Sequence, residues 1–198
     1  FRNSGLENQS VLYMMKSLDE EARVLLDPNQ LSEDGTLALV VYQPSPDGQL
    51  FAYSVSSQGS DWQEIRIRDV ETARDLEDRL EWVKFSLISW SREAKGFFYS
   101  RYDEPVSDNA FAGANYRQKL FHHRVGTSQE EDVLVYDDPD EKERGFVGVV
   151  SEDGRYLVIH VRLGTETRSR IYVKDLGSGS EVGDRRVVKL LDDFDARY

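Results

Sequence analysis

The chain has 198 residues, of which 39% are hydrophobic, and a formal net charge of −12. This hydrophobic content excludes a wholly disordered chain, and the acidic charge argues against a nucleic-acid partner, which would need a basic surface. The absence of cysteine excludes disulfides and thiolate metal sites. It fits a cytoplasmic location, which we expect, and is also compatible with the periplasm. No stretch has the roughly 18 apolar residues of a membrane-spanning helix, so no membrane partner is predicted.

A polar turn followed by an aromatic-rich strand occurs three times, and a second strand pattern follows each copy. The two patterns begin at Ser45 and Ile65, at Ser91 and Leu120, and at Ser151 and Ile171. The excess length of the middle copy falls in residues 103–115, whose Ser, Asn, Ala and Gly content predicts a long loop. Without this insertion the repeat length is near the period of about 40–50 residues that is typical of β-propeller blades.

In chain order, the patterns predict strands over residues 37–42, 50–55 and 62–70, then 83–90, 96–101, 116–125 and 132–136, then 146–150, 155–162 and 169–175. The first two strands of a group are apolar on both faces, as at Phe51, Ala52 and Tyr53, whereas the third alternates between Ile and Arg. This gradient is typical of a propeller, because neighbouring blades cover both faces of the inner strands. Residues 71–82 have helical spacing, but a blade needs a fourth strand there. We therefore expect a turn and an outer strand, with a short helix as the alternative.

These patterns predict an all-β fold, a partial β-propeller with about three complete four-stranded blades and flanking strands. The expected divisions of this one propeller domain are residues 1–30 (outer strands of a preceding blade), 31–80 (a blade), 81–138 (a blade with the insertion 103–115), 139–192 (a blade) and 193–198 (the start of the next blade). Neither end of the chain shows a start signal or a closing element, so we expect a piece of a longer protein.

The residues that could carry chemistry do not combine into a predicted catalytic site. The run Gly177-Ser-Gly-Ser180 lacks the Gly-x-Ser-x-Gly spacing of a serine nucleophile. His122 and His123 are adjacent on a strand, so they point to opposite faces and cannot share a metal. The acidic clusters at 137–141 and 192–195 are typical of solvated turns, with a carboxylate pair for glycoside hydrolysis as the alternative. We predict no catalytic residue, metal or cofactor in this chain.

Several runs of the sequence resemble the propeller of the prolyl oligopeptidase family. They include Gly59-Ser-Asp-Trp62, Trp82-Val-Lys-Phe-Ser86, Gly96-Phe-Phe-Tyr-Ser-Arg-Tyr102, Asn115-Tyr-Arg-Gln-Lys-Leu120 and Glu131-Asp-Val-Leu134. The resemblance covers almost the whole chain in order. It implies a parent protein in which a seven-bladed propeller caps an α/β-hydrolase domain. The Ser–His–Asp triad of that domain, beyond Tyr198, cleaves short peptides after proline.

The resemblance also implies two positions that face the substrate. Phe85 matches an aromatic residue that lines a pocket for a substrate residue preceding the proline, and packing between blades is its alternative role. Val135 occupies a position where some members of the family have a cysteine, so its assignment to the pocket wall departs from the family pattern. The implied partners are the α/β-hydrolase domain of the same protein and short proline-containing peptides.

The leading interpretation is a gating module of a serine peptidase, whose central channel excludes folded proteins by its width. On this interpretation the 103–115 loop is a mobile flap at the domain junction. The rival is a non-enzymatic propeller that serves as a protein-interaction platform. Oligopeptidase B shares the architecture but cleaves after basic residues, and the runs beginning at Trp82 and Asn115 favour the prolyl branch.

Overall fold

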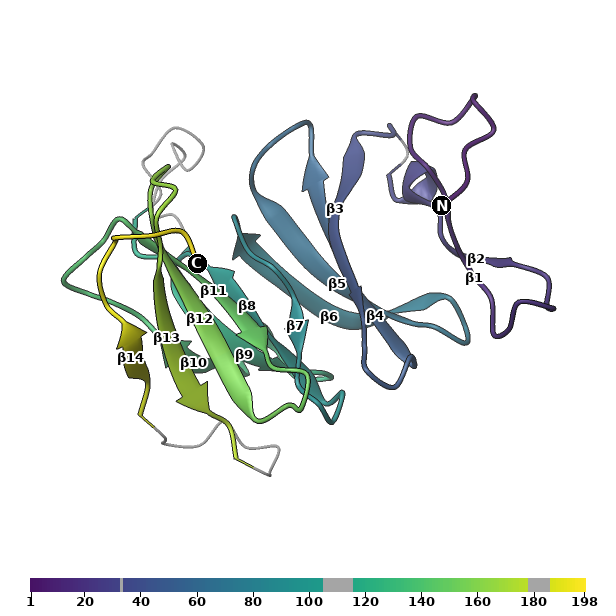
Figure 1. The fold of residues 1–198 in the computed structure, drawn as a ribbon. Helices are drawn as coiled ribbons and strands as arrows, with labels where there is room; N and C mark the ends of the chain where they lie inside the picture. Colours follow the sequence, from purple (N-terminus) through teal and green to yellow (C-terminus); the bar gives the residue numbers. More distant parts are fainter. Residues whose placement is uncertain (33, 105–115, 178–185) are drawn as a thin grey trace.

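The regular structure is almost entirely β-strand (Figure 1). The computed structural model describes residues 1–32, 34–104, 116–177 and 186–198. The strands are β1 (Leu12–Met14), β2 (Arg23–Leu26), β3 (Leu37–Pro44), β4 (Leu50–Ser57), β5 (Gln63–Asp69), β6 (Arg74–Val83), β7 (Ser89–Trp90), β8 (Gly96–Arg101), β9 (Lys119–Arg124), β10 (Val133–Tyr136), β11 (Arg144–Val150), β12 (Tyr156–Leu163), β13 (Arg170–Asp175) and β14 (Val188–Leu191). Two short 3₁₀ helices, η1 (Pro28–Gln30) and η2 (Gln129–Glu131), complete the elements.

The strands form antiparallel sheets that follow one another along the chain, each built from strands adjacent in sequence. We call β3–β6 blade A, β7–β10 blade B and β11–β14 blade C, and a β1–β2 hairpin precedes them. Blades A and B are joined at one residue pair, where Val83 at the end of β6 lies opposite Arg101 of β8. Figure 1 shows the sheets side by side, from the purple hairpin to the yellow strand β14. The fold is therefore a partial β-propeller.

Each inner strand divides its side chains between two neighbouring cores, because successive side chains point to opposite faces of a sheet. On β8, Phe97 and Tyr99 join a core shared with blade A, whereas Phe98 joins a core shared with blade C. On β4, Phe51 and Tyr53 pack against the β1–β2 hairpin. All five of the aromatic side chains named here are at most 4% exposed. The predicted two-sided burial is confirmed for β4 and β8, whereas β3 keeps one face exposed and β12 keeps one face half-buried.

The structure confirms one prediction near the end of blade A, for residues 71–82, and corrects another, for residues 83–90. Residues 74–83 form β6, so the outer strand predicted within residues 71–82 is confirmed and the helical alternative is wrong. The strand predicted over residues 83–90 is wrong as one continuous element, since Val83 ends β6 and only Ser89 and Trp90 form β7. The cause is the backbone, which takes positive φ values of 59° at Trp82 and 54° at Phe85. These left-handed residues bend the chain out of the sheet.

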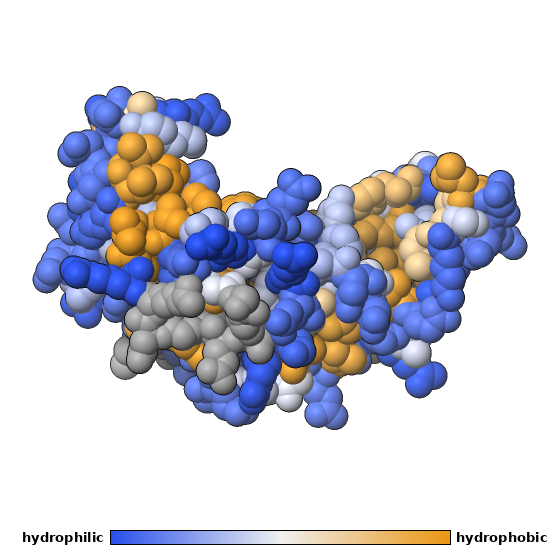
Figure 2. Space-filling model, turned by 60° about the horizontal axis from the view of Figure 1, so that its bottom comes forward, coloured by the Kyte–Doolittle hydropathy of each residue, from blue (hydrophilic) through white to orange (hydrophobic). Residues whose placement is uncertain are grey.

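The end sheets carry exposed apolar side chains. Val40 and Tyr42 on β3 are 46% and 41% exposed, and Val188 and Leu190 on β14 are 59% and 62% exposed. Figure 2 shows hydrophobic residues gathered in separate patches with hydrophilic surface between them. Patches of this kind are typical of surfaces that pack against further protein.

The turn that opens the first and third repeats is a hydrogen-bonded Ser-x-Asp-Gly loop. The Ser45 hydroxyl donates to the Asp47 carboxylate over 2.6 Å and accepts the Leu50 N–H over 2.9 Å. Gly48 completes the turn with φ of 71°, a conformation that glycine adopts without steric strain. Ser151, Asp153 and Tyr156 make the same two bonds at 2.6 and 2.9 Å.

The middle copy of this turn departs from the pattern. Its sequence is Ser91-Arg-Glu-Ala94, so an alanine takes the place of the glycine. Ala94 still adopts a φ of 57° and donates its N–H to the Ser91 carbonyl over 3.0 Å. Its Cβ atom is thus held in a region that disfavours L-residues by about 1–2 kcal/mol.

Replacing Ala94 with Gly should raise the free energy of unfolding by about 1 kcal/mol, because the left-handed strain is relieved. Urea unfolding measures this change. The matched reverse variant is Gly48→Ala, which places a Cβ in open space at the same backbone angle and should lower the free energy by a similar amount. A destabilised Ala94→Gly protein would contradict the assignment of strain to this turn.

Candidate functional site

The connector between blades A and B carries the predicted pocket residue Phe85. Its side chain is 51% exposed, and Phe85 belongs to none of the three cores of the described residues. A half-exposed phenylalanine with a φ of 54° combines an apolar surface with backbone strain, and such strain clusters at functional sites. The alternative role of Phe85 as packing between blades does not describe this position.

Lys84 lies between two aromatic rings. Its ammonium is 5.1 Å from the centre of the Phe85 ring and 5.2 Å from the centre of the Trp62 ring. Both distances are within the range of a cation–π attraction. The Asp61 carboxylate is 3.3 Å away, so the charge has a counterion although Lys84 is only 8% exposed.

Trp62 is held in turn by two further aromatic side chains. Its ring meets Trp82 and Tyr102 edge-on, with centroids 6.0 and 5.7 Å apart. Burial raises the pKa of Tyr102 to about 12, so this phenol is neutral at physiological pH. A cleft of about 540 Å³ lies beside the cluster and is lined by residues 57–62 and Lys84. Of the aromatic cluster, Trp62 lines this cleft together with Lys84.

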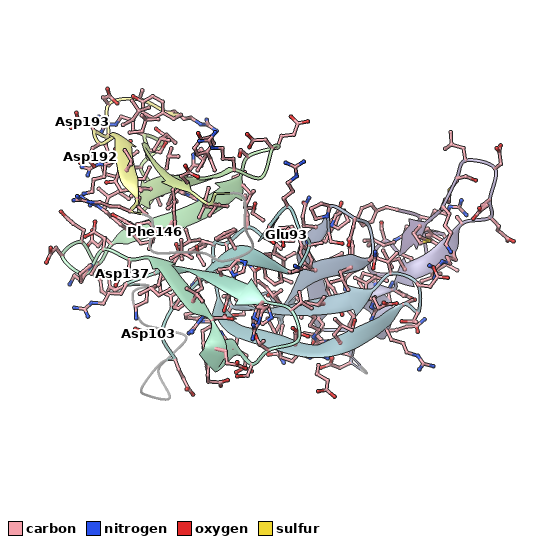
Figure 3. All side chains as sticks on the ribbon, turned by 90° about the horizontal axis from the view of Figure 1, so that it is seen from below. Glu93, Asp103, Asp137, Phe146, Asp192 and Asp193 are labelled. Carbon is pink, nitrogen blue, oxygen red and sulfur yellow. The ribbon has the colours of Figure 1, made fainter. Side chains whose placement is uncertain are left out.

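A buried amide fixes the backbone of the connector. Gln118, which is 3% exposed, donates from Nε2 to the Lys84 carbonyl over 2.7 Å. Its Oε1 accepts the N–H of Phe146 in blade C over 2.7 Å. Figure 3 shows Phe146 between the strands of blades B and C. One side chain thus ties the connector, the start of β9 and the first strand of blade C together.

Val135 occupies a different environment from Phe85. It lies on β10, is 9% exposed and packs in the core shared with blade C, which includes Leu120 and Phe146. It also reaches a second cleft of about 800 Å³, lined by residues 134–137, 174 and 186–189. The structure therefore does not bring the two predicted pocket residues together in one of these clefts.

The two adjacent histidines face different cores, as the strand period predicts. The His123 ring is 5.4 Å from the Phe97 ring and the His122 ring is 4.8 Å from the Phe98 ring, measured between centroids. Burial, together with the neighbouring His123, lowers the pKa of His122 to about 4. His122 is therefore neutral at physiological pH.

His123 links the outer strand of blade A to blade B through two carboxylates. Nδ1 donates to Asp132 over 2.7 Å and Nε2 donates to Asp78 over 3.0 Å, and the His123 side chain is fully buried. Asp132 also accepts from the Tyr99 hydroxyl over 2.5 Å. Burial alone would lower the pKa of His123, but the bonds to Asp132 and Asp78 outweigh it and raise the pKa to about 9. We call Asp78, His123 and Asp132 the blade A–B triad. Tyr99 is bonded to this triad through Asp132.

The acidic clusters do not form a paired catalytic centre in the described residues. Asp138 is bound by Arg144, and Asp192 accepts from Arg170 and Tyr172. Figure 3 shows Asp137 and Asp192 at well-separated places on the surface. Residues 105–115, in the predicted flap, and 178–185, in the run after Gly177, lie outside the described residues.

Among the described residues, no group of three or more His, Cys, Asp and Glu side chains could hold a metal ion. No helix in the same residues is long and apolar enough to cross a membrane.

Sequence reasoning did not identify Lys84, Gln118 or Asp78 as residues of interest. Lys84 and Gln118 lie within runs that resemble the family. Their partners, Trp62 for Lys84 and Phe146 for Gln118, are distant in sequence. The positive φ of Phe85 had no signal in the sequence. The one usable sign was an isolated Lys within the apolar run that begins at Trp82.

Replacing His123 with Gln should remove a pH-dependent part of the stability. Because the folded pKa of about 9 lies above the ordinary 6.5, the stabilisation is complete below pH 6.5. It declines as the pH rises and is lost above about pH 9. Urea unfolding should show a loss of roughly 3 kcal/mol between about pH 6 and pH 9.5 in the native protein, and a much smaller loss in His123→Gln.

The matched control is His160→Gln on β12. Burial lowers the pKa of His160, the opposite direction from His123, so its replacement should not remove the loss of stability at rising pH. If the stability of His123→Gln depends on pH as that of the native protein does, the His123 side chain does not carry the proton that the prediction assigns to it.

Replacing Gln118 with Leu should lower the free energy of unfolding by about 2–4 kcal/mol, because the Lys84 carbonyl and the Phe146 N–H would stay buried without partners. The control is Gln129→Leu. Gln129 also makes two amide bonds, to the backbone of Glu81 at 2.9 and 3.1 Å, but at an exposed position. Chemical denaturation of both variants makes the comparison, and equal small losses would contradict the bridging role of Gln118.

Comparison with known proteins identifies the family. A family model described as the N-terminal β-propeller domain of prolyl oligopeptidase matches residues 1–198. The chain is 40% identical over 176 residues to the prolyl endopeptidase of Elizabethkingia miricola, which covers 89% of this chain and 24% of that protein. It is 33% identical to the dual function macrocyclase-peptidase POPB of Galerina marginata, over 100% of this chain and 30% of that protein.

Solved structures agree with this assignment. The apo structure of prolyl oligopeptidase B from Galerina marginata has a TM-score of 0.85 and 33% identity, covering 99% of this chain and 29% of that one. A structure from a study of two prolyl endopeptidases has a TM-score of 0.85 and 36% identity, covering 98% and 27%. The chain thus spans about a quarter to a third of the length of these relatives. It belongs to the prolyl oligopeptidase family and corresponds to part of the N-terminal β-propeller domain.

Proposed function

We propose that this chain is the substrate-filtering part of a serine endopeptidase that cleaves short peptides after proline. The observation that carries the proposal is the match to the propeller of this family along all 198 residues, with relatives named as prolyl endopeptidases and oligopeptidases. The catalytic α/β-hydrolase domain belongs to the rest of the parent protein, which we place in the cytoplasm.

Propeller physics suits this filtering role. Blades A and B bury both faces against neighbouring sheets, so they cannot move apart without exposing aromatic side chains such as Phe97 and Phe98. The exposed apolar side chains of β3 and β14 are suited to the packing of further blades. A ring built in this way presents a channel whose width, rather than its affinity, decides which peptides enter.

Within this function, Phe85 is the principal substrate contact of the chain. Its half-exposed ring beside the cleft offers an apolar surface to a peptide side chain, and burying that surface favours binding. Val135 has a smaller role, because its side chain is packed in the core between blades B and C. It supports the wall of the neighbouring cleft.

The full-length parent protein provides the test. Chromogenic peptides of three or four residues that end in Pro, Lys or Arg before the reporter should be cleaved only after Pro. Peptides of about 10 residues should be cleaved much faster than a folded protein that contains the same sequence. Phe85→Ala should raise KM about tenfold for short peptides, the value expected for the loss of one apolar contact of about 1.4 kcal/mol.

Leu87→Ala is the matched control, since Leu87 is an exposed apolar residue of the same connector at 48% exposure. It should leave KM unchanged. Cleavage after Lys or Arg would assign the parent to oligopeptidase B chemistry instead. A folded full-length protein without peptidase activity would favour the non-enzymatic interaction platform.

A further inference from the structure

We propose that Lys84 is a positioning residue whose ammonium, held by Trp62 and Asp61, restrains the half-exposed Phe85 ring for contact with a substrate side chain. The inference rests on the proposed function, in which Phe85 contacts the peptide. It adds a role for a cationic residue that itself does not touch the substrate.

The first support is the position of the ammonium between the rings. Lys84 Nζ is almost equidistant from the ring centres of Phe85 and Trp62, at 5.1 and 5.2 Å. An attraction to both π faces restrains the orientation of Phe85, which belongs to none of the cores formed by the described residues. Trp62 packs edge-on against Trp82 and Tyr102. Because its ring is held in this way, the Trp62 ring restrains the position of the Lys84 ammonium.

The second support is the charge balance of the site. Lys84 is 8% exposed, and a buried ammonium needs a partner to remain charged. Asp61 supplies that partner at 3.3 Å, while its own carboxylate stays 67% exposed. The ammonium is therefore kept under the rings, and the counterion lies at the rim of the cleft lined by residues 57–62.

The third support is the backbone on either side of Lys84. Trp82 and Phe85 both adopt left-handed φ values, which non-glycine residues keep only when their surroundings hold them there. Gln118 binds the Lys84 carbonyl at 2.7 Å, and Ser86 Oγ accepts the N–H of Ser100 at 2.7 Å. The connector is thus held by hydrogen bonds on both sides of Phe85.

The expected consequence is preorganisation of the binding face. A methionine at position 84 would fill a similar volume but would attract neither ring and would not bind Asp61. The half-exposed Phe85 side chain would then gain rotamer freedom, which peptide binding would have to remove. The loss should fall on KM rather than on kcat, because the reacting bond lies in another domain.

The kinetic test uses the full-length protein and two short peptides that carry Phe or Ala two residues before the proline. Lys84→Met should raise KM for the Phe peptide about fivefold with kcat unchanged, and should have little effect on the Ala peptide. Lys84→Arg should restore the native KM, because a guanidinium also stacks on aromatic faces. The double variant Lys84→Met/Phe85→Ala should be no worse than Phe85→Ala alone.

A second measurement does not depend on activity. 4-Fluorophenylalanine placed at position 85 reports the environment of the ring by ¹⁹F NMR. Lys84→Met should move the resonance toward the position of a solvent-exposed ring and narrow it, whereas Lys84→Arg should not. Asp61→Asn leaves the apolar packing intact and should shift the resonance in the same direction, so it replaces Lys84→Met if that variant does not fold.

The outcomes separate the inference from the proposed function. An unchanged ¹⁹F spectrum in both Lys84→Met and Asp61→Asn overturns the positioning role, whatever the activity of the protein. A raised KM in Phe85→Ala but not in Lys84→Met also overturns it and leaves the pocket assignment standing. If Phe85→Ala leaves KM unchanged in a proline-specific enzyme, the substrate contact fails, even where the spectra show that Lys84 holds the ring.

Discussion

The whole architecture depends on the packing of each sheet against two neighbours. The two-residue period of a strand sends Phe97 and Tyr99 of β8 into one core and Phe98 into the other. Burying an aromatic side chain of this size contributes about 2–3 kcal/mol, and several such side chains act together in each core. A sheet with apolar residues on both faces has no stable form by itself. The sheets can exist only as a series.

Polar side chains then decide how the sheets are joined. Gln118 connects the blade A–B connector to blade C, and His123 connects β6 to blade B through Asp78 and Asp132. Such buried groups stabilise one arrangement because any other would leave a charge or an amide unpaired. The same constraint extends to the surface. Because the connector is fixed at Lys84, the neighbouring Phe85 can be exposed and still well ordered.

Prediction from the sequence succeeded where the signal was local. The Ser-x-Asp-Gly turns could be predicted because the hydrogen bonds that form them join residues at most five positions apart, as at Ser45. The strands that follow could be predicted with them. The prediction of a strand over residues 83–90 was wrong because Trp82 and Phe85 adopt positive φ angles, which residues with a side chain disfavour. Of the two pocket residues taken from the family resemblance, Phe85 lies exposed beside a cleft. Val135 lies in a core that no local pattern indicated.

The sequence by itself determined an all-β chain of repeated blades, the opposite orientation of His122 and His123, and membership of the prolyl oligopeptidase family. These conclusions follow from residue order and from the period of a strand, which act over a few residues. Only the tertiary structure decided that Asp78 binds His123, that Gln118 reaches Phe146 and that Lys84 lies between Trp62 and Phe85. Those contacts depend on the twist of neighbouring sheets and on how the sheets pack against each other. The periodicity of a strand does not determine which residues of two sheets come into contact.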